Sequence, residues 1–242
     1  MTRSRPRGLA LLSLLLVSTL LAPAIARAGI VVDGDAADWF GQLPPSDNTA
    51  RIARRSDGAG ELVWRDATGD ARGSAAARAC DLTQLRVSGD HDHLYLLARC
   101  AGPVTVAGDS AWQVQVSFDL NRFTGLGGTN FVGTDAAGVT PEAAWEYLVQ
   151  TRFGSGLGAR VVDPYGNEYV GAVAAVNASG VCEISVPWAA LGFAFVPADP
   201  IRICAASFLS NASDDVLPAG DGNASRAADV VTQYALAVGQ AR

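Results

Sequence analysis

Short apolar runs recur along the chain from residue 29 onward, and Gly, Asp, Asn and Pro separate them. The clearest run alternates: Trp112, Val114, Val116 and Phe118 are apolar, and the residues between them are Gln, Gln and Ser. A period of two is typical of a β-strand that buries one face and exposes the other. We therefore predict a half-buried strand at this point of the chain.

The same pattern predicts further short strands and no long helix. The expected strands are residues 29–32, 61–64, 81–88, 94–100, 112–120, 144–153, 159–162, 172–176, 181–187, 201–209 and 230–238. Strands of this length between turn residues favour an all-β fold, an antiparallel β-sandwich, over an α/β fold. A single helical turn is expected at 187–192, ended by Gly192.

The first 28 residues differ from the rest of the chain. Arginines at positions 3, 5 and 7 precede an apolar run over 9–21, and residues 26–28 are Ala-Arg-Ala. This order predicts a secretory signal peptide over 1–28, followed by a single domain over 29–242. The apolar run is shorter than the roughly 18 residues that a membrane-spanning helix needs. We expect a secreted protein, extracellular or periplasmic, with no membrane span after cleavage; an uncleaved N-terminal anchor is the alternative.

Charge excludes two classes of partner. The chain has 24 acidic and 18 basic residues, and every basic residue is Arg. Nucleic acids and anionic lipid surfaces are bound by clustered Lys and Arg, which this sequence lacks. We therefore expect no nucleic-acid partner.

Four cysteines follow the signal segment, and an even number in an oxidising compartment predicts two disulfides. A hairpin turning at residues 89–92 places Cys80 opposite Cys100. The same reasoning pairs Cys182 with Cys204, across a longer connection. A metal site or a catalytic thiol is the alternative, but no Cys-x-x-Cys spacing and no neighbouring His supports it.

Acidic residues gather in two polar loops. Asp66, Asp70 and Asp81 surround the first loop, 65–79, and could supply the oxygen ligands that Ca²⁺ prefers. Two other uses remain open: turn aspartates often accept hydrogen bonds from backbone N–H groups, and Asp81 could pair with Arg99. A second acidic region invites the same interpretations, with Asp214, Asp215, Asp221, Asn223 and Asp229.

Aromatic rings are the candidate sugar contacts, because the C–H face of a pyranose stacks on them. Most of the five Trp residues are expected in the core, where large rings gain most from burial. Trp64, beside the acidic loop, and Tyr165, at the tip of the 163–167 turn, are expected to be exposed and to contact ligand.

The sequence offers few of the residue combinations that hydrolytic enzymes use for catalysis. The two histidines, His91 and His93, share one turn, so no serine nucleophile has a separate base. A glycosidase needs two facing carboxylates, for which Glu146 and Glu183 are the candidates. We also expect no haem bound through Met and His ligands, because the sole Met is Met1, within the signal segment, and both histidines share one turn.

Several motifs occur in a recognisable order, and they lie at residues 30–39, 64–70, 80–87, 94–97, 113–119, 145–147 and 183–192. Together they resemble the DOMON-like superfamily, in particular family 9 carbohydrate-binding modules and the C-terminal domain of glucodextranase. The resemblance implies an immunoglobulin-like β-sandwich, structural calcium and binding of polysaccharide or cell-surface glycan.

The expected function is therefore that of a secreted, non-catalytic glycan-binding domain. A structural or adhesive protein that contacts other proteins of the cell envelope is the alternative. A glycoside hydrolase is the third possibility.

Overall fold

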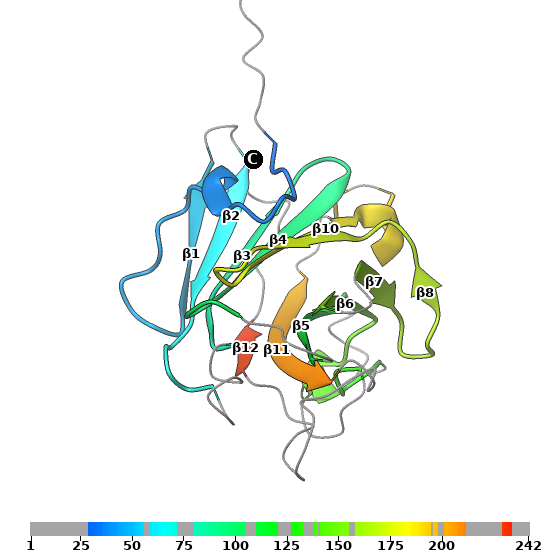
Figure 1. Cartoon of the computed structure of the whole chain (residues 1–242). Helices are drawn as coiled ribbons and strands as arrows, with labels where there is room; N and C mark the ends of the chain where they lie inside the picture. Colours follow the sequence, from blue (N-terminus) through cyan, green and yellow to red (C-terminus); the bar gives the residue numbers. More distant parts are fainter. Residues whose placement is uncertain are drawn as a thin grey trace, which may run out of the picture.

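The computed structural model describes residues 29–55, 59–71, 80–104, 110–120, 127–132, 138–139, 141–154, 158–194, 196–197, 201–211 and 229–233. Two antiparallel six-stranded sheets pack face to face (Figure 1). The predicted all-β sandwich is thus confirmed. The predicted signal peptide, 1–28, lies outside the described residues, as does the second acidic loop up to residue 228.

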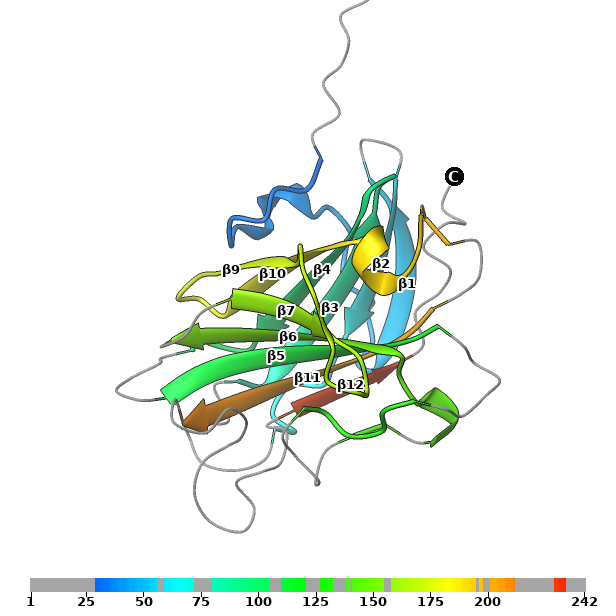
Figure 2. The same ribbon diagram turned by 90° about the vertical axis from the view of Figure 1, so that its right-hand side faces the viewer.

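The first sheet has the order β1-β2-β3-β4-β10-β9, and the second β12-β11-β5-β6-β7-β8 (Figure 2). The strands of the first sheet are β1 Thr49–Arg54, β2 Gly60–Arg65, β3 Leu82–Gly89, β4 His93–Cys100, β9 Val173–Val176 and β10 Val181–Pro187. Those of the second are β5 Ser110–Asp119, β6 Tyr147–Gly154, β7 Gly158–Val162, β8 Glu168–Tyr169, β11 Arg202–Asn211 and β12 Asp229–Gln233. Three short 3₁₀ helices complete the fold: η1 Ala36–Asp38, η2 Pro141–Ala143 and η3 Trp188–Leu191.

Most predicted strands are present, and the differences occur where the sequence pattern is weakest. Residues 29–32 are not a strand, whereas β1 and β8 are strands that the apolar pattern did not reveal. β1 has one large apolar residue, Ile52, and forms through its pairing with β2 at the edge of the sheet. The helical turn expected after β10 is η3, and Gly192 ends it with φ 77°.

The polar face of β5 is buried, so the prediction of a half-buried strand is wrong. Gln113 and Gln115 are fully buried under the segment that precedes β6. Gln115 hydrogen-bonds the backbone of Val132 in both directions: its Nε2 donates to the carbonyl at 3.1 Å, and its Oε1 accepts from the amide at 2.9 Å. Phe131 and Trp145 pack on the same outer face. A side-chain amide can donate to and accept from the backbone of the segment that covers it. These hydrogen bonds offset the free-energy cost of burying the polar side chains.

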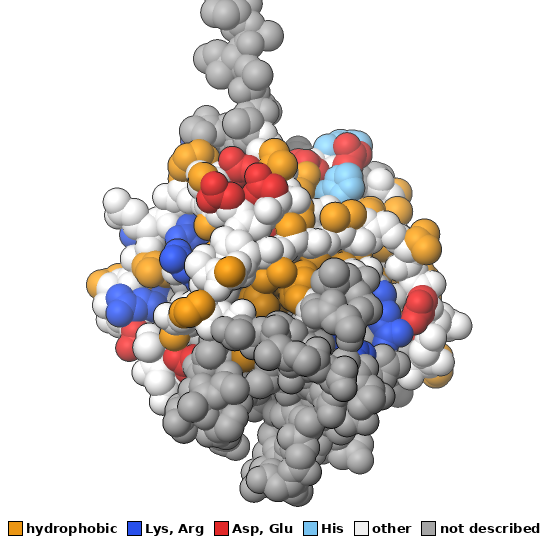
Figure 3. Space-filling model, in the orientation of Figure 1, with side chains coloured by type: hydrophobic (Ala, Val, Ile, Leu, Met, Phe, Trp, Pro, Cys, Tyr) orange, Lys and Arg blue, Asp and Glu red, His pale blue; other side chains and the backbone are white. Residues whose placement is uncertain are grey.

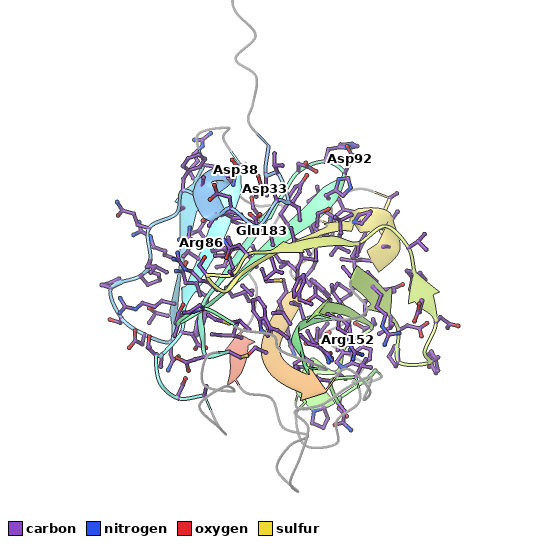
Figure 4. The ribbon with its side chains drawn as sticks, in the orientation of Figure 1. Asp33, Asp38, Arg86, Asp92, Arg152 and Glu183 are labelled. Carbon is purple, nitrogen blue, oxygen red and sulfur yellow. The ribbon has the colours of Figure 1, made fainter. Side chains whose placement is uncertain are left out.

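An N-terminal strap, residues 30–41, lies across the outer face of the first sheet (Figure 4). Glu183 of β10 fixes its first half: the amides of Asp33 and Gly34 donate to Oε2 at 3.1 and 2.8 Å, and Trp39 Nε1 donates to Oε1 at 2.7 Å. The strap residues Ile30 and Trp39 pack on apolar side chains of β4 and β10. Glu183 is a fully buried anchor for a segment about 150 positions away in sequence.

A second buried carboxylate holds the end of the strap. Glu61 of β2 accepts hydrogen bonds from the amides of Phe40 and Gly41 and forms an ion pair with Arg86 at 2.6 Å. A Cβ on Gly41 would come within 2.3 Å of a Val63 methyl group, so only glycine fits there.

The strap carries its own acidic residues. Asp33 and Asp38 are labelled in Figure 4, and Figure 3, in the same orientation, shows a group of red side chains at that place. Their carboxylates accept from backbone amides of the strap itself: Asp33 from Asp35, Asp35 from Ala37, and Asp38 from Val31. These side chains therefore cap local turns, the usual use of aspartate in such segments.

The predicted cysteine geometry needs correction. In the hairpin of β3 and β4, Cys100 pairs with Leu82 rather than with Cys80, because Gly89 pairs with Leu94 and the turn therefore spans residues 90–93, one residue later than predicted. Cys182 and Cys204 lie in different sheets: Cys182 belongs to the core between the sheets, and Cys204 to the outer cluster with Phe131. The pairing of Cys182 with Cys204 is therefore wrong, and the described residues contain no disulfide.

Burial raises the pKa of the Cys80, Cys182 and Cys204 thiols to about 12. Thiolates are the reactive form, so these groups are unreactive at neutral pH wherever they remain free thiols in the folded protein. Among the described residues, no helix is long and apolar enough to cross a membrane.

Candidate functional site

A pocket of about 450 Å³ opens at the end of the sandwich where β5 ends, β6 begins and the turn between β7 and β8 meets η3. We call it the tyrosine pocket. Its lining residues are Leu120, Gly127, Glu146, Tyr147, Asp163, Pro164, Tyr165, Tyr169, Leu191, Gly192 and Phe193. Its volume lies within the range of ordinary ligand pockets, roughly 300 to 1,000 Å³.

The turn between β7 and β8 is organised by one carboxylate. Asp163 Oδ1 accepts from the amides of Tyr165 and Asn167, both at 2.9 Å, and Oδ2 accepts from Asn167 Nδ2 at 2.7 Å and the Tyr169 hydroxyl at 3.1 Å. Gly166 closes the turn with φ +83°, a conformation that favours glycine. The turn is therefore preformed, and Tyr165 stands at its tip.

Four of the residues that line the pocket are aromatic. Tyr147 and Tyr169 meet edge to face with ring centroids 5.3 Å apart. Phe193 follows η3 and packs edge to face on the buried Trp188 at 6.4 Å. Tyr165 differs from the other aromatic residues, because it is 91% exposed. A ring that is exposed beside a hollow is available to a ligand.

Two carboxylates share this pocket. Glu146 lies just before β6, where its Oε2 accepts from the Leu120 amide at 2.7 Å. For Asp163, burial alone would raise the pKa, but the hydrogen bonds from Asn167, Tyr165 and Tyr169 outweigh it and hold the pKa below its usual value. Asp163 is therefore ionised at neutral pH. The pocket presents stacking surface and hydrogen-bond acceptors together.

The two predicted sugar contacts have different outcomes. Tyr165 is exposed as predicted and lines the tyrosine pocket. The prediction for Trp64 is wrong: this residue is 5% exposed and belongs to the core between the sheets. The alternation of Leu62 and Trp64 on one face of β2 was the signal that it points inward.

The three predicted calcium ligands lie around one loop, but they have different roles. Asp81 is buried and accepts from the amides of Gly69 and Ala71 at 2.7 and 2.9 Å, so its backbone-capping interpretation is confirmed. Asp70 is exposed. Gln84, rather than Asp81, lies opposite Arg99.

Asp66 is the one residue of this group with a feature that suits a cation. It is buried, and its Oδ2 has no hydrogen-bond partner in the described part of the chain. Burial raises the pKa of this carboxyl to about 6. The hydrogen bond from Trp64 acts in the opposite direction, and the nearby charge of Asp70 adds to the rise. Within the described residues, no three His, Cys, Asp or Glu side chains form a group that could hold a metal ion. Calcium at Asp66 therefore stays a prediction.

Other candidate catalytic residues lie away from the pocket. Glu183 is covered by the strap, and His91 and His93 belong to the hairpin turn between β3 and β4, where His91 Nδ1 lies 2.8 Å from Asp92 Oδ1. Of the two predicted glutamates, only Glu146 lines the tyrosine pocket.

Sequence reasoning missed Tyr147, Tyr169 and Phe193 as pocket residues. They come from β6, β8 and the segment after η3, which are distant in sequence and adjoin only in the folded sandwich. The Asp-Pro-Tyr-Gly-Asn turn at 163–167 was the one local signal. In comparisons with known proteins, no family model matches this sequence, and no curated protein matches it significantly.

Proposed function

We propose that this protein is a secreted, non-catalytic domain that binds glycan in the tyrosine pocket. The observation that carries this proposal is the position of Tyr165: this residue is 91% exposed and lines a pocket that also contains Glu146 and Asp163. A pyranose would stack its C–H face on the ring and donate a hydroxyl hydrogen bond to the Glu146 carboxylate. The β-sandwich is also the fold that the DOMON-like resemblance implies, although that resemblance itself stays a proposal.

A preformed turn favours binding, because less conformational entropy is lost when the ligand arrives. The hydrogen bonds to Asp163 already fix the backbone on both sides of Tyr165. When a ligand binds, Tyr165 therefore loses conformational freedom of its side chain but little of its backbone.

The state of Asp163 supports binding without catalysis. A glycosidase general acid needs a raised pKa, so that it holds a proton to give to the leaving oxygen. The pKa of Asp163 is lowered, and each of its oxygens accepts two hydrogen bonds from the turn. Its role is to hold the turn that presents Tyr165, because these four hydrogen bonds use all of its acceptor positions.

The alternative, an adhesive protein of the cell envelope, has one supporting observation. β1 lies at the edge of its sheet, and most of its side chains are exposed, including Ile52 at 53%. An edge strand can pair with a strand of another protein. However, Arg51 and Arg54 on the same strand are charges of the kind that discourage such pairing.

Replacing Tyr165 with Ala is expected to lower glycan affinity about tenfold, the effect of losing a central aromatic contact. The measurement is retention on a panel of soluble and insoluble polysaccharides, followed by titration with those that bind. Val170→Ala is the matched control, because Val170 is 92% exposed on the same hairpin and does not line the pocket. Equal affinities for the two variants, or no retention of the wild type on any polysaccharide, would contradict the proposal.

We also propose that the exported protein links Cys80 to Cys100. Both side chains lie in the core between the sheets, and the Ala101 amide donates to the Asp81 carbonyl at 2.7 Å, so β3 and β4 run together at this point. Alkylation of the unfolded, unreduced protein should label Cys182 and Cys204 alone. Reduction should then lower the free energy of unfolding by about 3 kcal/mol. A peptide that joins Cys100 to Cys182, or alkylation of all four residues, would refute this pairing.

A further inference from the structure

The β1 strand lies at the edge of the first sheet. It pairs with β2 along one side, and no described segment forms backbone hydrogen bonds with its other side. All of its residues are exposed except Ala53, which is half-buried. An open strand edge presents a row of backbone N–H and C=O groups, and an extended segment of another protein can add to it.

This edge is basic, although the protein as a whole is acidic. β1 carries Arg51 and Arg54 and no acidic residue, whereas the complete chain has 24 acidic and 18 basic residues. Both arginines are exposed, and within the described residues neither forms an ion pair. Figure 1 places β1 at the left edge of the first sheet, and Figure 3, in the same orientation, shows blue side chains on that side. The two charges are therefore available to a partner.

The side chains of β1 specify the charge and spacing of a strand that fits them. Arg51 and Arg54 are three positions apart and therefore lie on opposite faces of the strand. Ile52, which is 53% exposed, comes between them in sequence. Directly opposed side chains of an antiparallel pair interact, so that opposite charges stabilise the pair and like charges destabilise it. The matching segment has a carboxylate opposite each arginine and an apolar residue opposite Ile52.

A second copy of this chain fits the edge poorly. Two antiparallel β1 strands would bring four arginines into one short ribbon, with no carboxylate in either strand. Because like charges across a strand pair are destabilising, the arginines act against self-association. The charge that discourages pairing of β1 with itself favours pairing with an acidic strand.

We propose that β1 is a docking edge for an extended acidic segment of another protein, which adds to the first sheet as an antiparallel strand. None of the β1 residues lines the tyrosine pocket, so this surface is separate from the proposed glycan site. The two proposals therefore stand or fall independently.

The test is a titration of the purified protein with three blocked peptides. The first has Glu-Thr-Val-Glu at its centre, which opposes residues 54 to 51 of β1 in antiparallel register. The second has Gln in place of each Glu. The third keeps both Glu residues but carries N-methyl groups on consecutive central residues, so that it cannot donate backbone hydrogen bonds.

The first peptide is expected to bind about fivefold more tightly than the second at low salt, the combined effect of two exposed opposite-charge pairs. Added salt should reduce this ratio, because exposed charges are screened. The first peptide should also slow hydrogen exchange of β1 amides, because it covers the open edge. The third peptide should bind weakly and leave those amides unprotected.

Charge reversal locates the contact. In the double variant Arg51→Glu, Arg54→Glu the preference should reverse, so that a peptide with Lys in place of Glu binds most tightly. Arg99→Ala is the matched control: Arg99 is also exposed, but β4 pairs with both β3 and β10. This variant should keep the wild-type ratio between the first two peptides. A mere loss of folding would not reverse the preference.

Three results would overturn the proposal. One is equal binding of the acidic peptide and its Gln counterpart. Another is tight binding of the N-methylated peptide, which would show a site for polyanions, such as an acidic polysaccharide, without strand pairing. The third is self-association of the wild type, measured by sedimentation, that the double variant abolishes, because the edge would then belong to a second copy. Peptide binding without retention on any polysaccharide would contradict the glycan site alone.

Discussion

Replacing Glu183 with Ala is expected to lower the free energy of unfolding by about 4 kcal/mol, because three buried donors lose their acceptor together. The amides of Asp33 and Gly34 and the indole N–H of Trp39 all donate to this carboxylate. Each buried donor without a partner costs about 1 to 3 kcal/mol. Urea denaturation measures the total, and faster hydrogen exchange at Asp33 and Gly34 would show that the strap is released.

Two comparisons make the Glu183 result specific. Glu168→Ala removes a glutamate whose side chain is 57% exposed and pairs with Arg160, so it should cost less than about 1 kcal/mol. Glu183→Gln should fall between the two, because the amide keeps one acceptor oxygen but turns a donor toward the other N–H groups. If Glu183→Ala were as stable as Glu168→Ala, the carboxylate would not be the anchor of the strap.

The apolar pattern predicts this fold well where a strand has one apolar face between the sheets. β5 and β10 were located from such alternation, and their inward residues, such as Val114 and Ile184, are core residues. The pattern fails on the outer faces. Gln115, Glu61 and Glu183 are polar and nonetheless fully buried, because covering segments supply their hydrogen-bond partners.

Covering segments explain the failures, because sequence alone does not show which stretch covers which face. The strap lies over Glu183, and residues 131 and 145 lie over the polar face of β5. The same limit applies to the tyrosine pocket. Tyr165 was predictable from its own turn, whereas Tyr147 and Phe193 became pocket residues through the meeting of β6 with the end of η3.

Asp66→Asn is expected to stabilise the protein above neutral pH by about 2 kcal/mol, since burial of this carboxyl opposes its ionisation. Its pKa is raised from 3.8 to about 6 in the folded protein. The folded state therefore binds the proton more tightly than the unfolded state does. The stability that Asp66 contributes is fully present below a pH of about 4 and is lost as the pH rises through about 6.

The variant removes that loss, because asparagine stays neutral. Urea denaturation across this pH range, with chelator present, should show similar stabilities in acid and a widening advantage for Asp66→Asn as the pH rises. Asp47→Asn is the control: its side chain is 49% exposed and pairs with Arg65, so it should change stability by less than about 1 kcal/mol. An Asp66→Asn protein less stable than wild type at every pH would contradict this account of Asp66.

Bound calcium would reverse the expected order of stability of wild type and Asp66→Asn. The same two proteins therefore test for calcium binding at Asp66. A cation at Asp66 would favour the ionised carboxylate, and a ligand that binds only the folded state stabilises it by mass action. Wild type would then gain stability when calcium replaces chelator, and Asp66→Asn would not. Equal curves for wild type in calcium and in chelator would leave Asp66 as a buried carboxyl whose oxygen Oδ2 lacks a described partner, with protonation as its means of remaining buried.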